Sequence, residues 1–303
     1  MSSLYHKDIY KFEKPINSYW ESTVKPKDKF KTLDTDMSAN IVVIGGGYTG
    51  LSCALSLVEK HNEDVVLLEA GHIGWGSSGR NAGFCCIPPA KMSVKKMFKK
   101  YGRKETKNFF QNTIEGSYFT KNIIKEYNID CDLTGDSNFE VAPHPSYFES
   151  IKEEAETYKT AFGIETEVFT KEEFNEIGHG GNEQFGAMSY KPGFAINPLK
   201  FLIGLANAAN QAGVKIFQKS KVTKIEKING KYKIISNDHI INANKVVMAT
   251  NGFYKDDIFP KLNNLILPVI SNIIITRPLT DEEINSHNFI TRNPVLNIRN
   301  LLF

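Results

Sequence analysis

The stretch 41–60, IVVIGGGYTGLSCALSLVEK, followed by DVVLLEA at 64–70, decides the fold of this chain. Its first four residues form a continuous apolar, β-branched run, which is typical of a strand buried on both faces. A glycine turn follows, and apolar residues then recur at helical spacing as far as Val58. Val65–Leu68 is a second short apolar run. The stretch therefore predicts a βαβ unit with parallel strands and a right-handed crossover.

The glycine turn reads GxGxxG in Gly45, Gly47 and Gly50, and an acidic residue, Glu69, closes the second strand 19 residues later. This is the context of a dinucleotide-binding fingerprint. The first glycine makes the tight turn, the second lets the backbone approach a pyrophosphate, and the third lets the helix pack on the strand. The helix N-terminus then faces the phosphates. Tyr48 and Thr49 complete the predicted phosphate-binding turn.

Glu69 is predicted to accept hydrogen bonds from the ribose hydroxyls of an adenosine. A 2′-phosphate would be repelled by this carboxylate, so the sequence disfavours NADP. The fingerprint alone does not separate NAD from FAD. No second GxGxxG follows a strand in the sequence, which argues against reductases that bind both dinucleotides.

Composition is that of an ordinary globular protein: 303 residues, 41% hydrophobic, 23% charged and a formal net charge of +3. No nucleic-acid partner is implied by so small a charge, and the lysine runs are interpreted as a solvated helix face. The N-terminal residues lack the apolar core of a signal peptide, and no apolar run is long enough to cross a membrane. We therefore expect a cytoplasmic protein.

Four cysteines are present, at Cys53, Cys85, Cys86 and Cys131. They form no CxxC pair and no secreted framework, so reduced thiols and no metal site are expected.

Further along the chain, residues 90–127 read as a charged helix and 147–162 as an amphipathic helix that Gly163 ends. Asn197 and Pro198 predict the start of another helix, which runs to Gly213. Asn229-Gly230 lies between alternating runs and predicts a hairpin. A buried strand is expected at 245–249, and strand-like character is expected again in the last forty residues. Residues 1–36 read as an extended arm.

Directly after the acidic strand, residues 71–84 read GHIGWGSSGRNAGF, a second loop rich in glycine and serine. Together with 41–70, this loop resembles the N-terminal FAD signature of the D-amino-acid-oxidase-like (DAO) family of FAD-dependent oxidoreductases. Within that family it is most similar to the gamma-glutamylputrescine oxidoreductase branch. The arm motif Asn17-Ser18-Tyr19-Trp20 is similar to that branch's segment before the FAD signature.

The resemblance implies that the second loop lines the pyrophosphate and approaches the flavin. Serine hydroxyls and a forked arginine cation suit phosphate. The segments NPLKFLIGLANAANQAGVKIFQKSKVTKIE and KVVMATNGFY extend the resemblance, and they imply a backbone contact to adenine and a strand that returns to the cofactor. The cofactor residues implied by the resemblance are Ser77, Ser78, Arg80, Asn81, Gly83, Val222, Thr250 and Gly252.

The predicted fold class is α/β (α+β), with a Rossmann-like FAD-binding domain interleaved with an antiparallel-sheet substrate domain. The expected boundaries are an arm at 1–36, an FAD-binding domain at 37–130 and 197–260, and a substrate domain at 131–196 and 261–303. His144, Tyr190, Lys191 and Arg277 fall in segments that the family uses for its substrate domain, and for each we favour a structural role. No catalytic residue is assigned.

The implied activity is oxidation of a primary or secondary amine, gamma-glutamylputrescine-like, by hydride transfer to the flavin N5. The product is an imine that hydrolyses to an aldehyde, and oxygen or another acceptor reoxidises the flavin. The FAD is expected to be non-covalent, with Cys85 or Cys86 as alternative attachment points. One alternative activity is that of a sarcosine- or glycine-oxidase-like amino-acid oxidase or dehydrogenase.

Two departures from the family stand out. Ala82 and Phe84 replace residues that are commonly Gly and Gln in this branch. The sequence also stops at NPVLNIRNLLF, before the C-terminal part that the family carries. The remaining alternatives are a truncated, catalytically silent FAD-binding chain, or half of a split enzyme whose missing part a separate chain supplies.

Overall fold

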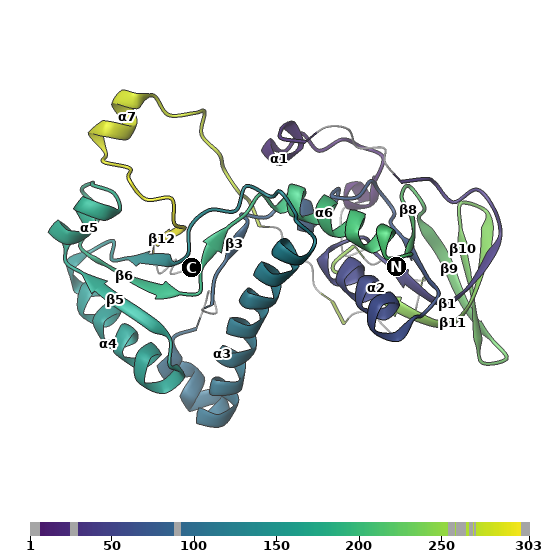
Figure 1. Cartoon of the computed structure of the whole chain (residues 1–303), viewed down its shortest axis with the longest axis horizontal. Helices are drawn as coiled ribbons and strands as arrows, with labels where there is room; N and C mark the ends of the chain where they lie inside the picture. Colours follow the sequence, from purple (N-terminus) through teal and green to yellow (C-terminus); the bar gives the residue numbers. More distant parts are fainter. Residues whose placement is uncertain are drawn as a thin grey trace. The chain divides into compact units, whose positions relative to one another are not determined.

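The computed structural model describes residues 7–24, 30–87, 92–253, 258, 265–266, 269 and 271–297 (Figure 1). The chain divides into two compact units, each assembled from separate segments. Unit 1 comprises Met1–Ala82, Tyr127–Cys131 and Asn197–Ile274. Unit 2 comprises Gly83–Glu126, Asp132–Ile196 and Ile275–Phe303.

The division differs from the expected boundaries in three places, one of which is the second boundary with the substrate domain, which falls after Ile274 and not after residue 260. Residues 83–126 were expected in the first domain, but they pack within unit 2, because their helix buries Val94, Met97 and Phe110 in that unit's core. Residues 7–24 do not stand apart as an arm, since they pack within unit 1.

Unit 1 is built on a six-stranded sheet in the order β8-β2-β1-β11-β10-β9. The central strands β1 and β2 pair in parallel, as do β1 with β11 and β2 with β8. Val65–Leu68 is buried along its whole length, as its continuous apolar run predicted. The strand bounds are β1 Met37–Ile44, β2 Val65–Leu68, β8 Lys215–Phe217, β9 Val222–Ile228, β10 Lys231–Ser236 and β11 His239–Met248.

Two long helices of unit 1, α2 (Tyr48–His61) and α6 (Pro198–Gln211), pack against each other (Figure 1). The Asn197 side chain accepts a hydrogen bond from Lys200 N, so α6 begins with the predicted cap and a proline in its first turn. Shorter helical segments are η1 (Lys7–Tyr10), α1 (Tyr19–Ser22) and η2 (Ser77–Gly79). The extended conformation expected for the whole arm is therefore wrong, because η1 and α1 interrupt it.

Unit 2 holds a four-stranded sheet in the order β12-β4-β6-β5, in which β6 pairs antiparallel with β4 and β5. Its core includes a stacked pair, Phe110 of α3 and Phe162 of α4, with ring centroids 4.0 Å apart. The strand bounds are β3 Phe84–Cys85, β4 Asn138–Val141, β5 Glu165–Phe169, β6 Ala187–Lys191, β7 Phe194–Ala195 and β12 Val295–Asn297. The helix bounds are α3 Val94–Glu126, α4 Pro145–Phe162, α5 Lys171–Ile177 and α7 Asp281–Ser286.

Local signals located several boundaries correctly. Gly163 takes a left-handed conformation directly after α4, and the Asn229-Gly230 turn joins β9 to β10 with positive φ at both residues. Among the described residues, the strand-like character expected for the last forty residues is confirmed only at β12 (Val295–Asn297). Residues 271–280 belong to no strand, and a capping box between Thr280 and Glu283 starts α7 instead. Within the described residues, no helix has the length and apolar character needed to cross a membrane.

Candidate functional site

The glycine turn between β1 and α2 is compressed against the end of β11. A Cβ on Gly45 would lie 2.4 Å from the Ala249 carbonyl oxygen, and Gly45 has a φ of +112°. A Cβ on Gly50 would lie 1.9 Å from the carbonyl oxygen of Gly45 itself. These two glycines are therefore required by the packing of helix on strand.

Gly47 differs from the other two glycines of the motif. It is the N-cap of α2, and a Cβ there would meet only the Ser78 side chain, with Oγ at 2.9 Å. Gly47 has no side chain that could cap the helix, so the first turn of α2 presents its positive dipole end to the cavity that it lines. Such a helix end is suited to an anion.

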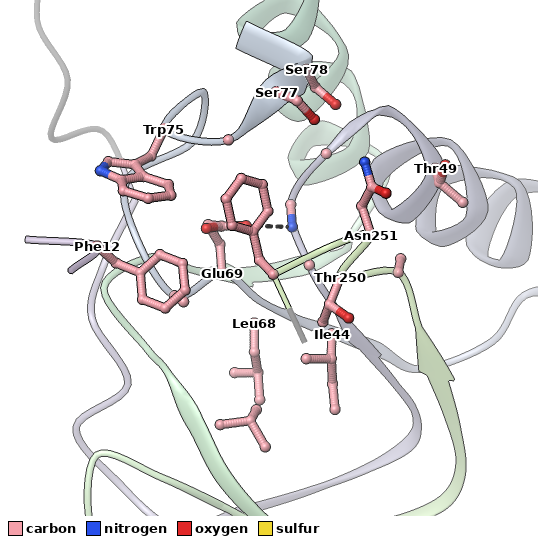
Figure 2. Close-up of a pocket in the computed structure, with 18 of the residues that line it drawn as sticks. Phe12, Ile44, Thr49, Leu68, Glu69, Trp75, Ser77, Ser78, Thr250 and Asn251 are labelled. Atoms are coloured by element: carbon pink, nitrogen blue, oxygen red, sulfur yellow. Dashed lines mark hydrogen bonds between the residues drawn. The ribbon is translucent and has the colours of Figure 1, made fainter. Parts of the chain in front are cut away.

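Glu69, at the end of β2, holds the glycine turn in place. Its Oε2 accepts from the Gly46 backbone N–H at 2.7 Å, and its Oε1 accepts from the Gly71 N–H at 2.9 Å (Figure 2). Burial raises the pKa of the Glu69 carboxyl, and the backbone N–H donors oppose that shift. Each carboxylate oxygen has a second acceptor position, so ribose hydroxyls can still bind there.

The second loop supplies hydroxyls from η2. Ser77 and Ser78 line the cavity, and Ser78 Oγ accepts from the Tyr48 backbone N–H at 3.2 Å. Arg80 stacks its guanidinium over the Trp75 ring, 5.2 Å from the centroid, and its Nε donates to the Gly76 carbonyl at 3.3 Å. Burial lowers the pKa of Arg80. The guanidinium thus braces the loop.

Asn81 has a similar bracing role. Its Nδ2 donates to the Ser78 carbonyl at 3.0 Å and to the Ser77 carbonyl at 3.3 Å. These contacts fix the backbone that carries the two serines.

A cavity of about 420 Å³ lies in unit 1 at the carboxyl ends of β1, β2 and β11 (Figure 2). This position is where open α/β sheets bind their ligands. Of the residues predicted from the sequence, those that line it are Gly45, Gly47, Tyr48, Thr49, Glu69, Ser77, Ser78, Val222 and Thr250.

Five predicted residues are placed elsewhere. Gly50, Arg80, Asn81 and Gly252 are not among the described residues that line the cavity. Gly252 lies in the turn after β11, in which Phe253 N donates to the Thr250 carbonyl at 3.0 Å. Gly83 belongs to unit 2.

One wall of the cavity is aromatic, and sequence analysis missed it. Phe12, Trp75 and Phe253 line it, with ring centroids 4.9 Å apart for Phe12–Trp75 and 5.5 Å apart for Trp75–Phe253. Tyr10 and Lys221 also line the cavity. No local pattern connects these residues, because contacts between distant segments bring them together.

Three of the candidate substrate residues of unit 2 form polar contacts within the protein, and the fourth, Tyr190, packs against Tyr158. His144 caps α4, and its ring accepts from the Ser146 N–H. Lys191 Nζ lies 2.9 Å from a Glu165 carboxylate oxygen.

The Arg277 guanidinium forms two hydrogen bonds to Glu283, of 2.7 and 2.8 Å. Tyr190 is fully buried beside Tyr158, and burial raises its pKa. Contacts of these kinds are typical of residues with a structural role.

The cavity's chemistry is that of binding. Among the described residues that line it there is no histidine or cysteine, and Glu69 is the carboxylate. A helix N-terminus, two serine hydroxyls, a carboxylate and an aromatic wall fit the phosphates, sugar and base of a dinucleotide. These residues therefore fit a bound dinucleotide, and the reactive chemistry belongs to the cofactor.

Comparison with known proteins points the same way. Residues 40–300 match the family described as FAD dependent oxidoreductase (DAO). Gamma-glutamylputrescine oxidoreductase of Escherichia coli is 29% identical over 267 residues, which are 88% of this chain and 61% of that protein. The chain thus spans about three fifths of the length of this relative.

Two solved structures have the same fold. L-proline dehydrogenase from P. horikoshii has a TM-score of 0.60 at 22% identity, covering 87% of this chain and 65% of that one. Glycine oxidase from Geobacillus kaustophilus has a TM-score of 0.58 at 17% identity, covering 71% of this chain and 56% of that one. The predicted Rossmann-like α/β class is confirmed by these likenesses and by the sheet of unit 1.

Proposed function

Because the chain belongs to the DAO family of FAD-dependent oxidoreductases, whose cofactor is FAD, we propose that its unit 1 cavity binds the ADP half of FAD and that it oxidises an amine. The substrate is a primary or secondary amine of the gamma-glutamylputrescine type. The product is an imine, which water hydrolyses to an aldehyde. Oxygen or another acceptor then reoxidises the flavin.

The observation that carries the cofactor assignment is the arrangement of Gly47 and Glu69 around one cavity. Gly47 opens α2 with no side chain of its own, and Ser78 Oγ accepts from the Tyr48 N–H, so the rest of the positive helix end is available for the pyrophosphate. Glu69 lines the same cavity and offers acceptors for the ribose hydroxyls. Ser77 and Ser78 add hydroxyl donors from the facing loop.

We propose supporting roles for the remaining cofactor residues. Val222 begins β9, is buried and lines the cavity, and we assign to its backbone the contact with the adenine edge. Thr250 follows β11 and also lines the cavity. Arg80, Asn81 and Gly252 shape the loops that carry the lining residues.

When bound, FAD supplies the acceptor for a hydride from the substrate carbon. The protein's part is to bind and orient the cofactor and to keep water from it. A neutral amine needs no dedicated base for this oxidation, so it does not require a histidine or cysteine among the described residues that line the cavity.

The substrate class rests on the named activity of the Escherichia coli relative, which the chain matches over 88% of its own length. The second candidate is an amino-acid oxidase or dehydrogenase of the sarcosine or glycine type. Its support is the fold shared with glycine oxidase and L-proline dehydrogenase. Both candidates use the same cofactor site, so only substrates distinguish them.

The test is spectroscopic. The purified protein should carry flavin absorbance bands, and anaerobic mixing with gamma-glutamylputrescine should bleach them. Bleaching by sarcosine, glycine or proline instead would favour the second candidate. Free FAD mixed with each amine is the control. Flavin bands that no amine bleaches would contradict an amine-oxidising chain and leave a silent FAD-binding one.

A further inference from the structure

Residues 10–23 lie before the part of the chain that matches the family, which begins at residue 40. They nevertheless contribute directly to the cavity of unit 1. Tyr10 and Phe12 both line it, and Figure 2 shows Phe12 beside Trp75 at the cavity. We call residues 10–23 the strap.

The strap is fastened to the glycine- and serine-rich loop by two indole hydrogen bonds. Trp75 Nε1 donates to the Lys14 carbonyl at 2.9 Å. In the opposite sense, Trp20 of the strap donates through Nε1 to the Asn81 carbonyl at 3.0 Å. One tryptophan from each segment thus binds the backbone of the other.

Two further contacts hold the C-terminal half of the strap. Glu21 is buried, and its Oε1 lies 3.2 Å from His72 Nε2. Thr23 Oγ1 accepts from Asn197 Nδ2 at 2.9 Å, next to the start of α6. The strap is therefore attached both to the loop and to the segment that leads into α6.

Phe12 is held between a cation and an indole. Lys221 Nζ lies 5.4 Å from its ring centroid, and the Trp75 ring lies 4.9 Å away, edge to face. The two contacts together restrict the position of the ring. The third ring of the wall, Phe253, lies 6.3 Å from Phe12.

The aromatic wall lies close to the ribose acceptor. The N–H of Gly71 donates to Glu69 Oε1 at 2.9 Å. A Cβ on the same Gly71 would lie 2.9 Å from Trp75 Cβ and 3.4 Å from the Phe12 carbonyl oxygen. A nucleoside whose sugar binds Glu69 therefore has its base within reach of these rings.

We propose that the strap is a working part of the cofactor site, and that Phe12, supported by Trp75 and Lys221, packs against the adenine of FAD. The inference rests on the proposed function. It assigns a cofactor-binding role to residues outside the family-matched part of the chain. Bound adenine should also slow the local unfolding of the strap, because the strap then contacts both the cofactor and the loop.

The test compares Phe12→Ala and Phe12→Leu with the wild-type apoprotein. Calorimetric titrations with FAD and with ADP measure binding without any turnover. Phe12→Ala should bind both ligands about 10-fold more weakly, the loss typical of removing one base–aromatic contact. Phe12→Leu should lose less, because it keeps apolar contact. ADP should report the same factor as FAD, since the adenine is common to both.

Lys11→Ala is the matched control, because Lys11 is adjacent in sequence but its side chain pairs with Asp8 at the surface. It should bind as the wild type does. Wild-type affinity for both ligands in Phe12→Ala would overturn the inference and leave the proposed function standing. Failure of the wild type itself to bind FAD or ADP would overturn both.

A second measurement covers the case in which the variants do not fold. Limited trypsinolysis of the wild-type protein should cleave after Lys11, which is partly exposed and directly precedes Phe12, and saturating ADP should slow that cleavage. Cleavage at Lys159, exposed at the C-terminal end of α4 in unit 2, serves as the internal reference. Equal cleavage after Lys11 with and without bound ADP would also overturn the inference.

Discussion

Glu69 and Gly46 are joined by a hydrogen bond of 2.7 Å, in which the carboxylate Oε2 accepts the backbone N–H of the glycine turn. The acidic residue at the end of β2 therefore anchors the turn that opens α2, and it also faces the cavity. One side chain links the shape of the phosphate-binding turn to the predicted ribose contact. Binding and local stability are coupled at this residue.

Glu69→Ala should consequently affect both properties. It leaves the N–H groups of Gly46 and Gly71 without their acceptor, so we expect a loss of about 1–3 kcal/mol in the free energy of unfolding. FAD affinity should fall as well, because the ribose acceptors are gone. Urea unfolding followed by circular dichroism, and FAD titration, measure the two effects. Glu156→Ala, which removes an exposed carboxylate on α4, is the control and should change neither.

Gly47→Asp should fold but fail to retain FAD. A side chain at Gly47 meets only the movable hydroxyl of Ser78, and aspartate is a favoured N-cap residue. Its carboxylate would occupy the helix end and repel the pyrophosphate. The variant should be colourless after purification, with an unchanged circular dichroism spectrum. A normal flavin content would disprove the assigned role of Gly47.

Gly50→Ala, unlike Gly47→Asp, should destabilise the fold itself. Its Cβ would lie 1.9 Å from the Gly45 carbonyl oxygen, a backbone atom that cannot move without displacing α2 from β1. We expect the free energy of unfolding to fall by about 1–3 kcal/mol, as it does in overpacked cores. Thermal unfolding in the absence of FAD measures it directly. Wild-type stability would contradict a steric requirement for glycine at position 50.

FAD should be bound without a covalent link. Burial raises the pKa of the Cys85 and Cys86 thiols to about 11, so neither is a thiolate near neutral pH. Acid precipitation should release all of the flavin into the supernatant, and the intact protein mass should contain no flavin adduct. Cys86→Ser should carry as much flavin as the wild type. A flavin-modified peptide containing residues 85–86 would contradict this prediction.

The stability of unit 2 should decline at alkaline pH. Burial, with Glu154 nearby, raises the pKa of Glu140 to about 8, and Tyr158, Tyr190 and Cys86 belong to the same cluster. Because the folded-state pKa exceeds the unfolded value, this group's contribution is complete below the unfolded pKa and is lost as pH rises through about 8.

Glu140→Gln tests this expectation, since the amide does not titrate. Urea unfolding at about pH 6.5 and about pH 9 should show a smaller loss of stability in the variant than in the wild type. Equal losses in both proteins would rule out Glu140 as the source. Glu156→Ala serves again as the exposed control.

The glycine turn and the parallel core of unit 1 could be predicted because their determinants are local. Apolar runs define β1 and β2, and the spacing of Gly45, Gly47 and Gly50 sets the turn between them. Gly163 and the Asn229-Gly230 pair likewise act through their own backbone conformations. Patterns of this kind can be read from one segment at a time.

Unit boundaries were harder to predict because they depend on contacts between segments that are distant in the sequence. Which core the charged helix α3 joins depends on Phe110 meeting Phe162, a contact between separate segments. The C-terminal segment was expected to be strand-like, yet the capping box of Thr280 and Glu283 starts a helix there.

By itself, the sequence determined the βαβ unit, the acidic end of its second strand and the resemblance to a flavoprotein family. It also supplied nine of the residues that line the cavity. Only the tertiary structure decided that Arg80 braces Trp75 and that Phe12 lies in the cavity wall. The physical reason is that a turn or a helix start is fixed by neighbours in the chain. Contacts between aromatic rings, by contrast, depend on how distant segments pack, which no local spacing encodes.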